Sequence, residues 1–535
     1  MKLKHIIENL DGVVKVEGKT NLEITGIACD SKAVKPGYLF VALKGSRVNG
    51  ADFIDDAIGR GACAIILDNG DKGIFQRGDT FIYTEDARFG LAQASQAFFG
   101  DLSAKMRLVG VTGTNGKTTI TYLMESMFQS KLEAVGVIGT VNYRFGMRLI
   151  PAVNTTPSSL ELYSLLSGMY KEKIKNCIIE ISSHSLEQAR VETLQFDAAI
   201  FTNLTREHLD FHKNMDEYLN AKLKLFSKIK LRGTAVINID DSASEKIIQK
   251  VRAEGRAKII TYAIDREADI RALDIKLSCD GLKFRLGVAE RSSAPINIES
   301  SLIGRHNIYN ILAAVGAGMS LGMSLDDIKK GVEALKTLPG RLESVGCGQR
   351  FSVYVDYAHT EDGLEKVLKS LRELKPARLI TVFGCGGNRD RAKRPAMGKI
   401  STELSDIVFI TSDNPRTEDP KDIINEIAKG ISLAKNNYII EPDRFNAIKK
   451  AVLASGDGDI VLVAGKGHEI CQIFKDTTIP FDDREVVKKI LGEFILNPSN
   501  HKCHCEERRD SSPVIARPRS GRSSLKDRLG TGSAI

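Results

Sequence analysis

The 535-residue chain lacks any apolar run of the roughly 18 residues that a helix needs to cross a bilayer. Its first residues, Met1 to Leu10, contain two lysines but neither an apolar core nor a small-residue cleavage site, which predicts a first helix and no signal peptide. The nine cysteines follow no pairing pattern, and an unpatterned odd number is typical of reduced thiols. These absences predict a cytoplasmic protein without stable membrane insertion.

A concentrated basic surface is also missing. The net charge is +8, but residues 497–535 hold eight Lys/Arg and four Asp/Glu, so they carry +4 of it. The remaining +4 is spread over residues 1–496, which is too dilute for a nucleic-acid partner. Residues 497–535 are rich in Ser, Arg, Pro and Gly without apolar periodicity, so we expect this tail to be disordered.

The strongest local pattern is Leu108-Val-Gly-Val-Thr-Gly-Thr-Asn-Gly-Lys-Thr-Thr119, where a short apolar strand, a glycine-rich turn and a helical pattern follow one another. Glycines let backbone N–H groups converge on a phosphate, and a helix N-terminus favours the same negative charge. Lys117 would add a positive charge for the β- and γ-phosphates, and the Thr118 hydroxyl can ligate Mg²⁺. Val111 stands where the usual loop has a glycine, so the match is to a variant loop. The alternative is a glycine-rich turn beside a surface lysine.

Strand-like and helix-like segments alternate along residues 1–496, which predicts an α/β fold with three domains. The central domain, 104–336, would be a doubly wound, mostly parallel sheet that carries the phosphate loop, because several of its predicted strands are continuous apolar runs. A Pro-Gly break at Leu338–Glu343 predicts a hinge before a Rossmann-like C-terminal domain, 337–496. A smaller α/β domain, 1–103, precedes both. The predicted strands are Glu23–Asp30, Tyr38–Leu43, Ala62–Leu67, Leu108–Val111, Ala134–Ile138, Cys177–Ile181, Ala198–Thr202, Ala235–Ile239, Ser352–Asp356, Leu379–Phe383, Ile407–Thr411 and Ile460–Val463.

Polar residues gather after the predicted central strands, where a doubly wound sheet holds its ligands. Glu180 lies near the end of one strand and His208 follows another, and a carboxylate with an imidazole suits Mg²⁺ or Mn²⁺ near a γ-phosphate. The alternatives are a strand-end charge facing solvent for Glu180 and a position beside a helix N-terminus for His208. Their place on the same sheet edge as the phosphate loop favours a metal site.

A nucleotide, a metal and two further α/β modules are compatible with a kinase, a ligase or a mechanical ATPase. Separate modules favour a reaction that joins several substrates, since domain closure can bring them together and exclude water. A nucleic-acid translocase would need the basic surface that this chain lacks. A non-catalytic nucleotide-binding scaffold is the remaining class.

Six motifs stand out together: Gly113–Thr119, Glu180–His184, Thr202–Asp210, Gly304–Asn307, Leu338–Arg341 and Asp356–His359. They resemble the Mur ligases of peptidoglycan synthesis, and within them the ligases that add the third residue of the stem peptide. The resemblance extends from Met1 to about Leu496. It implies a bacterial cytoplasmic enzyme, and we expect a monomer. Another ligase of the same superfamily, such as a folylpolyglutamate synthetase, is the alternative.

The resemblance also implies how two substrates are held. The residues implied for UDP-N-acetylmuramoyl-L-alanyl-D-glutamate are Ser31, Ser46, Arg47 and Val48 at the UDP, and Asn154, Thr155, Thr156, Ser182, Gln188 and Arg190 at the muramoyl dipeptide. Those implied for ATP are Gly113, Thr114, Asn115, Gly116, Lys117, Thr118 and Thr119 in the loop, with Asn307, Arg341 and Asp356 near the adenine and ribose or at the hinge.

Metal and catalytic roles follow from the same resemblance. Mg²⁺ would be held by Thr118, Glu180, His208 and Lys222, and the catalytic residues would be Lys117, His208 and Lys222. Lys222 lies where the family carries a carbamylated lysine. CO₂ converts an ammonium into an anion that can serve a metal, whereas an unmodified ammonium repels it. Without the resemblance, an exposed helical lysine would be the simpler interpretation.

The third substrate implied is meso-2,6-diaminopimelate, because Asp413-Asn-Pro-Arg416 resembles the signature of the ligases that add it. Lysine-adding relatives lack this arginine. Diaminopimelate has a distal carboxylate that L-lysine lacks, and an arginine can hold a carboxylate through two parallel hydrogen bonds. A surface turn with an exposed arginine, or an L-lysine-adding enzyme, is the alternative. The residues implied for diaminopimelate are Arg389, Asp413, Asn414, Pro415, Arg416, Gly465 and Glu469.

Overall fold

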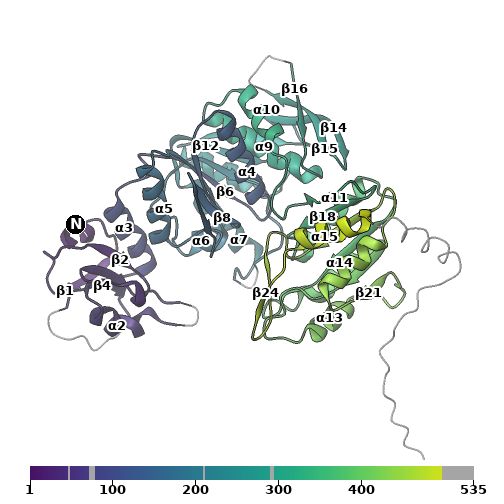
Figure 1. Cartoon of the computed structure of the whole chain (residues 1–535). Coiled ribbons are helices and arrows are strands. Elements are labelled where there is room, and N and C mark those ends of the chain that lie inside the picture. Colours follow the sequence, from purple (N-terminus) through teal and green to yellow (C-terminus); the bar gives the residue numbers. More distant parts are fainter. Residues whose placement is uncertain (46–47, 71–78, 209–210, 290–293, 497–535) are drawn as a thin grey trace, which may run out of the picture.

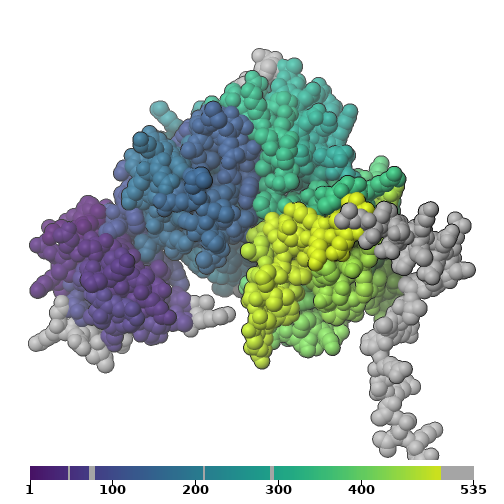
Figure 2. All heavy atoms as spheres, viewed as in Figure 1, coloured from purple at the N-terminus to yellow at the C-terminus, as the bar shows by residue number. Residues whose placement is uncertain are grey.

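The structure is a computed structural model that describes residues 1–45, 48–70, 79–208, 211–289 and 294–496. Three main sheets succeed one another along the chain, each within one of the predicted segments, and a small two-stranded sheet follows (Figure 1). The space-filling view shows the N-terminal and C-terminal parts as separate lobes joined through the central part (Figure 2). The predicted α/β class is confirmed, while the exact domain borders stay predictions. The tail 497–535, with Ser46 and Arg47, lies outside the described residues.

The N-terminal sheet has the strand order β1-β5-β4-β3-β2, and only its β1–β5 pair is antiparallel. Each face of the sheet has its own apolar core. The helices α1 and α3 cover one face, and α2 covers the other. The strands are β1 (Val13–Glu17), β2 (Gly26–Ala28), β3 (Tyr38–Val41), β4 (Ala62–Asp68) and β5 (Phe81–Thr84). The helices are α1 (Leu3–Ile7), η1 (Ser31–Ala33), η2 (Gly50–Phe53), α2 (Ile54–Gly59) and α3 (Ala87–Phe99).

The central sheet has eleven strands in the order β16-β15-β14-β13-β12-β11-β6-β10-β7-β8-β9. Its middle, from β7 to β14, is parallel, and an antiparallel pair extends each edge. The strands are β6 (Arg107–Thr112), β7 (Val135–Ile138), β8 (Asn142–Phe145), β9 (Arg148–Pro151), β10 (Asn176–Glu180), β11 (Phe196–Phe201), β12 (Ile229–Asn238), β13 (Lys258–Ala263), β14 (Ile270–Ser278), β15 (Gly281–Val288) and β16 (Ile296–Ser300).

Helices cover both faces of the central sheet, which is why nearly every residue of its middle strands β6, β10 and β11 is buried. One core forms under α4, α9 and α10, and the other under α5, α6, α7 and α8. The helices are α4 (Lys117–Ser130), α5 (Ser159–Lys171), α6 (Ser183–Glu187), α7 (Met215–Phe226), α8 (Ser244–Glu254), α9 (Arg305–Ser320) and α10 (Leu325–Ala334). Among the described residues, no helix is both long enough and apolar enough to cross a bilayer.

The C-terminal sheet has the order β17-β18-β22-β19-β20-β21 and is parallel except at β17, and a small hairpin, β23–β24, follows it. The strands are β17 (Glu343–Ser344), β18 (Ser352–Asp356), β19 (Leu379–Phe383), β20 (Ile407–Ile410), β21 (Tyr438–Ile440), β22 (Ile460–Ala464), β23 (Cys471–Ile473) and β24 (Thr478–Pro480). The helices are α11 (Glu361–Glu373), α12 (Lys393–Leu404), α13 (Pro420–Ala428), α14 (Arg444–Leu453) and α15 (Asp483–Leu496).

Candidate active site

The phosphate loop joins β6 to α4, as the sequence pattern predicts. Gly113 has a φ of +143°, and a Cβ there would lie 1.8 Å from the Thr202 hydroxyl oxygen. Gly116 has a φ of +90°, and a Cβ there would lie 2.2 Å from the Asn310 side-chain oxygen. The loop is fixed to the neighbouring segment because the backbone N–H of Thr114 donates to the Asn203 carbonyl over 2.8 Å. Both glycines are therefore required by the conformation and by close approach.

Lys117 is the first residue of α4 and points back over the loop. Its ammonium donates to the backbone carbonyls of Gly113 and Thr114 over 2.9 and 2.8 Å. Burial lowers the pKa of Lys117 below its ordinary value, while the carboxylates of Glu207 and Glu180 oppose this shift. A bound triphosphate would give the ammonium stronger, charged acceptors than these carbonyls.

Glu180 ends β10 with only 1% of its surface exposed, so the solvent-facing alternative is wrong. Its carboxylate accepts hydrogen bonds from the Thr118 hydroxyl over 3.1 Å and from the Thr140 hydroxyl over 2.9 Å. A buried carboxylate beside a hydroxyl at the loop supplies hard oxygen donors, which fit Mg²⁺. Among the described residues, no three His, Cys, Asp or Glu side chains converge as a metal group. A magnesium ion here would thus also need phosphate or water oxygens, which it commonly keeps.

His208 follows β11 with a φ of +57° and lines the same cavity as Glu180. Its ring centre lies 4.8 Å from that of His184 and 6.2 Å from that of Tyr218. Residues 209 and 210, which close the predicted motif, lie outside the described residues. The structure brings His208 and Glu180 to one cavity wall, and a shared metal remains a prediction.

Lys222 lies on α7, as predicted, and is 1% exposed. Its nitrogen sits 4.2 Å from the centre of the Tyr218 ring, and the Tyr218 hydroxyl lies 3.2 Å from that of Thr114 in the phosphate loop. Burial holds the pKa of Lys222 far below its ordinary value, and the charge of Lys117 adds to this effect, with Glu207 opposing it. The interpretation as an exposed helical lysine is therefore wrong. An amine in this setting favours its neutral, nucleophilic form.

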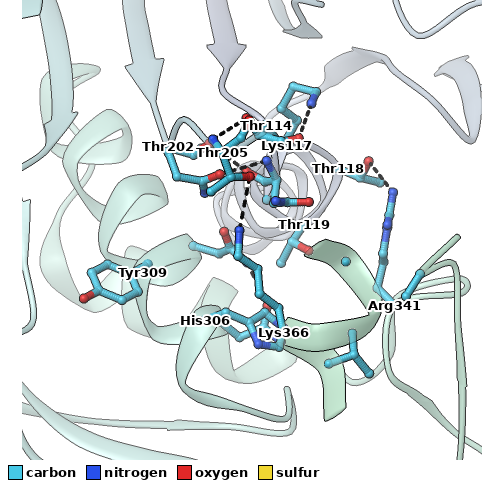
Figure 3. A pocket seen from close by; sticks show the side chains of 18 of the residues that line it. Thr114, Lys117, Thr118, Thr119, Thr202, Thr205, His306, Tyr309, Arg341 and Lys366 are labelled. Carbon is cyan, nitrogen blue, oxygen red and sulfur yellow. Dashed lines mark hydrogen bonds between the residues drawn. The ribbon is translucent and has the colours of Figure 1, made fainter. Parts of the chain in front are cut away.

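The loop opens into a cavity of about 700 Å³ that residues of the central and C-terminal parts line together (Figure 3). From the C-terminal side, Arg341 donates to the Thr118 hydroxyl over 3.5 Å, and Lys366 donates to the Thr205 hydroxyl over 3.3 Å (Figure 3). The Asp362 carboxylate accepts from the Thr205 hydroxyl over 2.9 Å. The volume suits a nucleotide held between two domains.

Three residues predicted for the nucleotide also line this cavity: Asn307, Arg341 and Asp356. The Asn307 side-chain amide is oriented by donating to the Ile303 carbonyl over 2.7 Å. Burial raises the pKa of Asp356, while Arg341 opposes the shift. Asp356 also accepts from the Leu342 backbone N–H over 2.7 Å, so it holds the Pro-Gly segment that was predicted as a hinge.

The residues predicted for the muramoyl dipeptide form a network beside Glu180. The Thr156 hydroxyl donates to the Glu180 carbonyl over 2.7 Å and accepts from the Ser182 backbone N–H over 3.1 Å. The Arg190 guanidinium donates to the Thr156 carbonyl over 2.6 Å and to the Gln188 side chain over 2.7 Å. The Thr155 hydroxyl is hydrogen-bonded to the Thr140 hydroxyl, which in turn donates to the Glu180 carboxylate. Asn154 is exposed, and its backbone carbonyl accepts a hydrogen bond from the Tyr143 hydroxyl.

Of the residues predicted for the UDP, the structure describes Ser31 and Val48, both in the N-terminal lobe. Ser31 is buried at the start of the short helix η1, and Val48 is exposed. Ser46 and Arg47 lie between these two and outside the described residues.

The residues predicted for diaminopimelate follow the carboxyl ends of β19, β20 and β22. The Asn414 side chain donates to the Glu469 carboxylate over 2.7 Å, and the backbone N–H of Gly465 donates to the Asp356 carbonyl over 3.0 Å. Arg416 has a φ of +52° and donates to the Gly387 carbonyl over 2.8 Å. Within the described ranges, Nε and Nη2 of Arg416 make no hydrogen bond.

This C-terminal set borders the nucleotide cavity rather than lining it. Tyr357 lines the cavity, and its ring centre lies 4.9 Å from that of His468, which adjoins Glu469. Asp413 and Pro415 are buried at the turn, whereas Arg389 is exposed. Arg389 and Arg416 are absent from the cavity lining among the residues described.

Comparison with known proteins agrees with this geometry. Three family models match the chain: "Mur ligase family, catalytic domain" over residues 23–96, "Mur ligase middle domain" over 111–318 and "Mur ligase, glutamate ligase domain" over 340–467. A UDP-N-acetylmuramoyl-L-alanyl-D-glutamate–2,6-diaminopimelate ligase from Solibacter usitatus is 44% identical over 88% of this chain and 94% of its own length. The chain belongs to the Mur ligase family. It is thus an ATP-dependent ligase, and the predicted resemblance is confirmed.

Two further relatives cover nearly the whole of this Mur ligase. The ligase of the same name from Clostridium tetani is 43% identical over 92% of this chain and all of its own length. A solved structure with that name superposes with a TM-score of 0.67 at 32% identity, covering 92% of this chain and 99% of the other.

Sequence reasoning missed several residues of this Mur ligase site. Thr140, Asp362 and Lys366 contribute to it through contacts between distant elements, which no local motif signals. Glu207 lies inside the recognised motif Thr202–Asp210, beside His208, and Lys466 lies between the predicted residues Gly465 and Glu469. These positions in the sequence were the available signal.

Proposed function

We propose that this Mur ligase joins meso-2,6-diaminopimelate to UDP-N-acetylmuramoyl-L-alanyl-D-glutamate at the expense of ATP. The observation that carries the proposal is the Asp413–Arg416 turn. There the Asn414 side chain donates to the Glu469 carboxylate, and the nearby Arg416 guanidinium keeps N–H groups that make no hydrogen bond within the described residues. Relatives at 44% and 43% identity that bear the corresponding name support it. A monomeric state and a cytoplasmic location stay predictions.

The reaction proceeds in two steps. The side-chain carboxylate of the D-glutamate attacks the γ-phosphorus of ATP, which gives an acyl phosphate and ADP. The amine of diaminopimelate then attacks the acyl carbon, phosphate leaves, and the nitrogen loses a proton as the amide forms. Lys117 stabilises the negative charge on the transferred phosphoryl group, and closure of the C-terminal part around the Pro-Gly hinge excludes water from the acyl phosphate.

Four residues would hold Mg²⁺ in this proposal: Thr118, Glu180, His208 and a carbamylated Lys222. When bound, the ion would neutralise charge on the β- and γ-phosphates. Glu180 orients the Thr118 hydroxyl for this role through their 3.1 Å hydrogen bond. The network of Thr156, Ser182 and Arg190 would position the dipeptide next to it.

The function is tested by phosphate release from purified protein. We expect release only when ATP, Mg²⁺, the UDP-muramoyl dipeptide and diaminopimelate are all present, with a tripeptide product of matching mass. Equal or faster turnover with L-lysine would contradict the specificity, and turnover stimulated by DNA or RNA would contradict the function.

Arg416→Met is expected to raise the KM for diaminopimelate by about 10- to 100-fold, because a charged hydrogen bond to the distal carboxylate contributes about 1.5–3 kcal/mol. The KM for ATP should stay unchanged. Arg350→Met, which removes an exposed pair with Asp457, is the control and should alter neither constant. A variant at Arg416 that still prefers diaminopimelate to L-lysine by the wild-type ratio would show that this side chain does not read the carboxylate.

A further inference from the structure

Lys466 is a cation with no exposed surface in the turn that follows β22. Its ammonium donates to the Asn414 side-chain oxygen over 3.1 Å, to Oε2 of Glu469 over 3.2 Å and to the Cys471 carbonyl over 2.6 Å. An ammonium has three N–H groups, so these three acceptors use all of them. Lys466 therefore has no donor left for a substrate.

Lys466 decides which way the Asn414 amide faces. The amide oxygen accepts from Lys466 and from the Ile473 backbone N–H over 3.0 Å, and the amide nitrogen donates to Glu469. Reversing the amide would set its NH₂ group against the ammonium and against a second donor, which leaves buried polar groups unpaired. The cation thus locks the amide in one orientation.

The same contacts fix Glu469. Its Oε2 accepts from both Asn414 and Lys466, which holds the carboxylate at the rim of the turn. Oε1 makes no hydrogen bond to any residue in the part of the chain that the structure describes, and the side chain keeps 31% of its surface exposed. One carboxylate oxygen therefore binds the protein while the other faces outward, where an ammonium group can reach it.

We propose that Lys466 is a positioning residue for amino-acid recognition, which holds the Asn414 amide and the Glu469 carboxylate in the geometry that receives the diamino acid. The inference rests on the proposed function, since it names what organises that substrate's site. Lys466 touches no substrate. Loss of Lys466 therefore weakens binding of the incoming amino acid. It leaves the nucleotide cavity unchanged, because Lys466 does not line that cavity among the described residues.

The test compares Lys466→Met and Lys466→Gln with wild type in steady-state assays. Methionine keeps most of the buried apolar stem and removes all three donors, whereas glutamine retains an NH₂ group. We expect the KM for diaminopimelate to rise at least about tenfold in Lys466→Met and less in Lys466→Gln, because the amide and carboxylate lose their shared donor. The KM for ATP and for the UDP-muramoyl dipeptide should stay within about twofold.

The matched control is Arg378→Met. Arg378 pairs with Asp459 at the amino ends of β19 and β22, at the opposite edge of the same sheet. The substitution removes a partly buried ion pair of the C-terminal part but no contact to Asn414 or Glu469. It should therefore leave the KM for diaminopimelate unchanged even if it lowers the stability of the protein.

Each outcome decides the matter. A wild type that ignores diaminopimelate overturns the proposed function and this inference with it. A wild type that uses it, combined with an unchanged KM in Lys466→Met, overturns this inference alone. So does the same rise in KM in Arg378→Met. Failure of both Lys466 variants to fold would also overturn it, because the cation would then serve the fold and not the site.

Discussion

Lys222→Met is expected to lower kcat by at least about 1000-fold, the scale of losing a charged group from a phosphoryl-transfer site. The free energy of unfolding should stay the same or rise. Burial lowers the pKa of Lys222, and the neighbouring charge of Lys117 lowers it further, so both favour the neutral amine. A neutral amine can attack CO₂, forming an N–C bond and losing a proton, and the resulting carbamate is an anion of the kind that a metal accepts. Methionine fills the space of the lysine side chain but cannot form the carbamate.

The control for Lys222 lies two residues along the same helix. Lys224 is exposed and pairs with Glu187 over 2.8 Å, so Lys224→Met should keep wild-type activity. Assays in buffer depleted of CO₂ should show slowed turnover that returns with added bicarbonate. With ¹³C-bicarbonate, a carbamate resonance should appear in wild type and in Lys224→Met but not in Lys222→Met. Full activity of Lys222→Met, or no response to CO₂, would contradict the assignment.

The sign of the pH effect for unmodified Lys222 follows from its pKa. The folded value is lowered below the unfolded one, so between the two the unfolded chain binds more protons. The free energy of unfolding therefore rises as pH increases through that window and falls as pH decreases through it. Below the folded pKa both states bind the proton, so Lys222 adds no further pH dependence. Lys222→Met should remove this dependence.

The sequence predicted the parallel strands best because they are buried on both faces. The observed β18 and β19 begin and end where the predicted strands Ser352–Asp356 and Leu379–Phe383 do. The antiparallel edges of the central sheet were not predicted. In β15, for example, buried and exposed residues alternate between Leu282 and Leu286. That alternation is the pattern of a half-buried strand, but it contains no continuous apolar run, which was the signal that identified the parallel strands.

The candidate site divides in the same way. The phosphate loop is local, so adjacent residues specify it. The burial of Lys222 was not predicted from the residues alone, although Tyr218, Lys222 and Leu225 share one face of α7. Lys466 and Asp362 act instead through partners 52 and 157 residues away, Asn414 and Thr205. Only the folded chain brings such pairs together.

Lys117→Met is expected to lower kcat by about 1000-fold or more with a smaller effect on ATP binding, because the ammonium counters charge that grows during phosphoryl transfer. Without nucleotide, Lys117 is held by the Gly113 and Thr114 carbonyls, so the side chain is already placed over the loop. Lys117→Arg should not restore activity, since a planar guanidinium cannot sit as a point charge within the loop. Initial rates at saturating ATP measure the effect on kcat, and a separate nucleotide-binding assay measures the effect on ATP affinity.

Lys131 provides the matched control for Lys117 because it caps the other end of α4 and pairs with Glu133 over 2.7 Å. Its replacement by methionine removes an equal charge from the same helix, outside the cavity, and should leave kcat unchanged. If Lys117→Met kept more than about a tenth of the wild-type rate, the charge at the loop would contribute less than about 1.4 kcal/mol to the transition state. The backbone N–H groups of the loop and the metal would then account for the phosphoryl transfer without it.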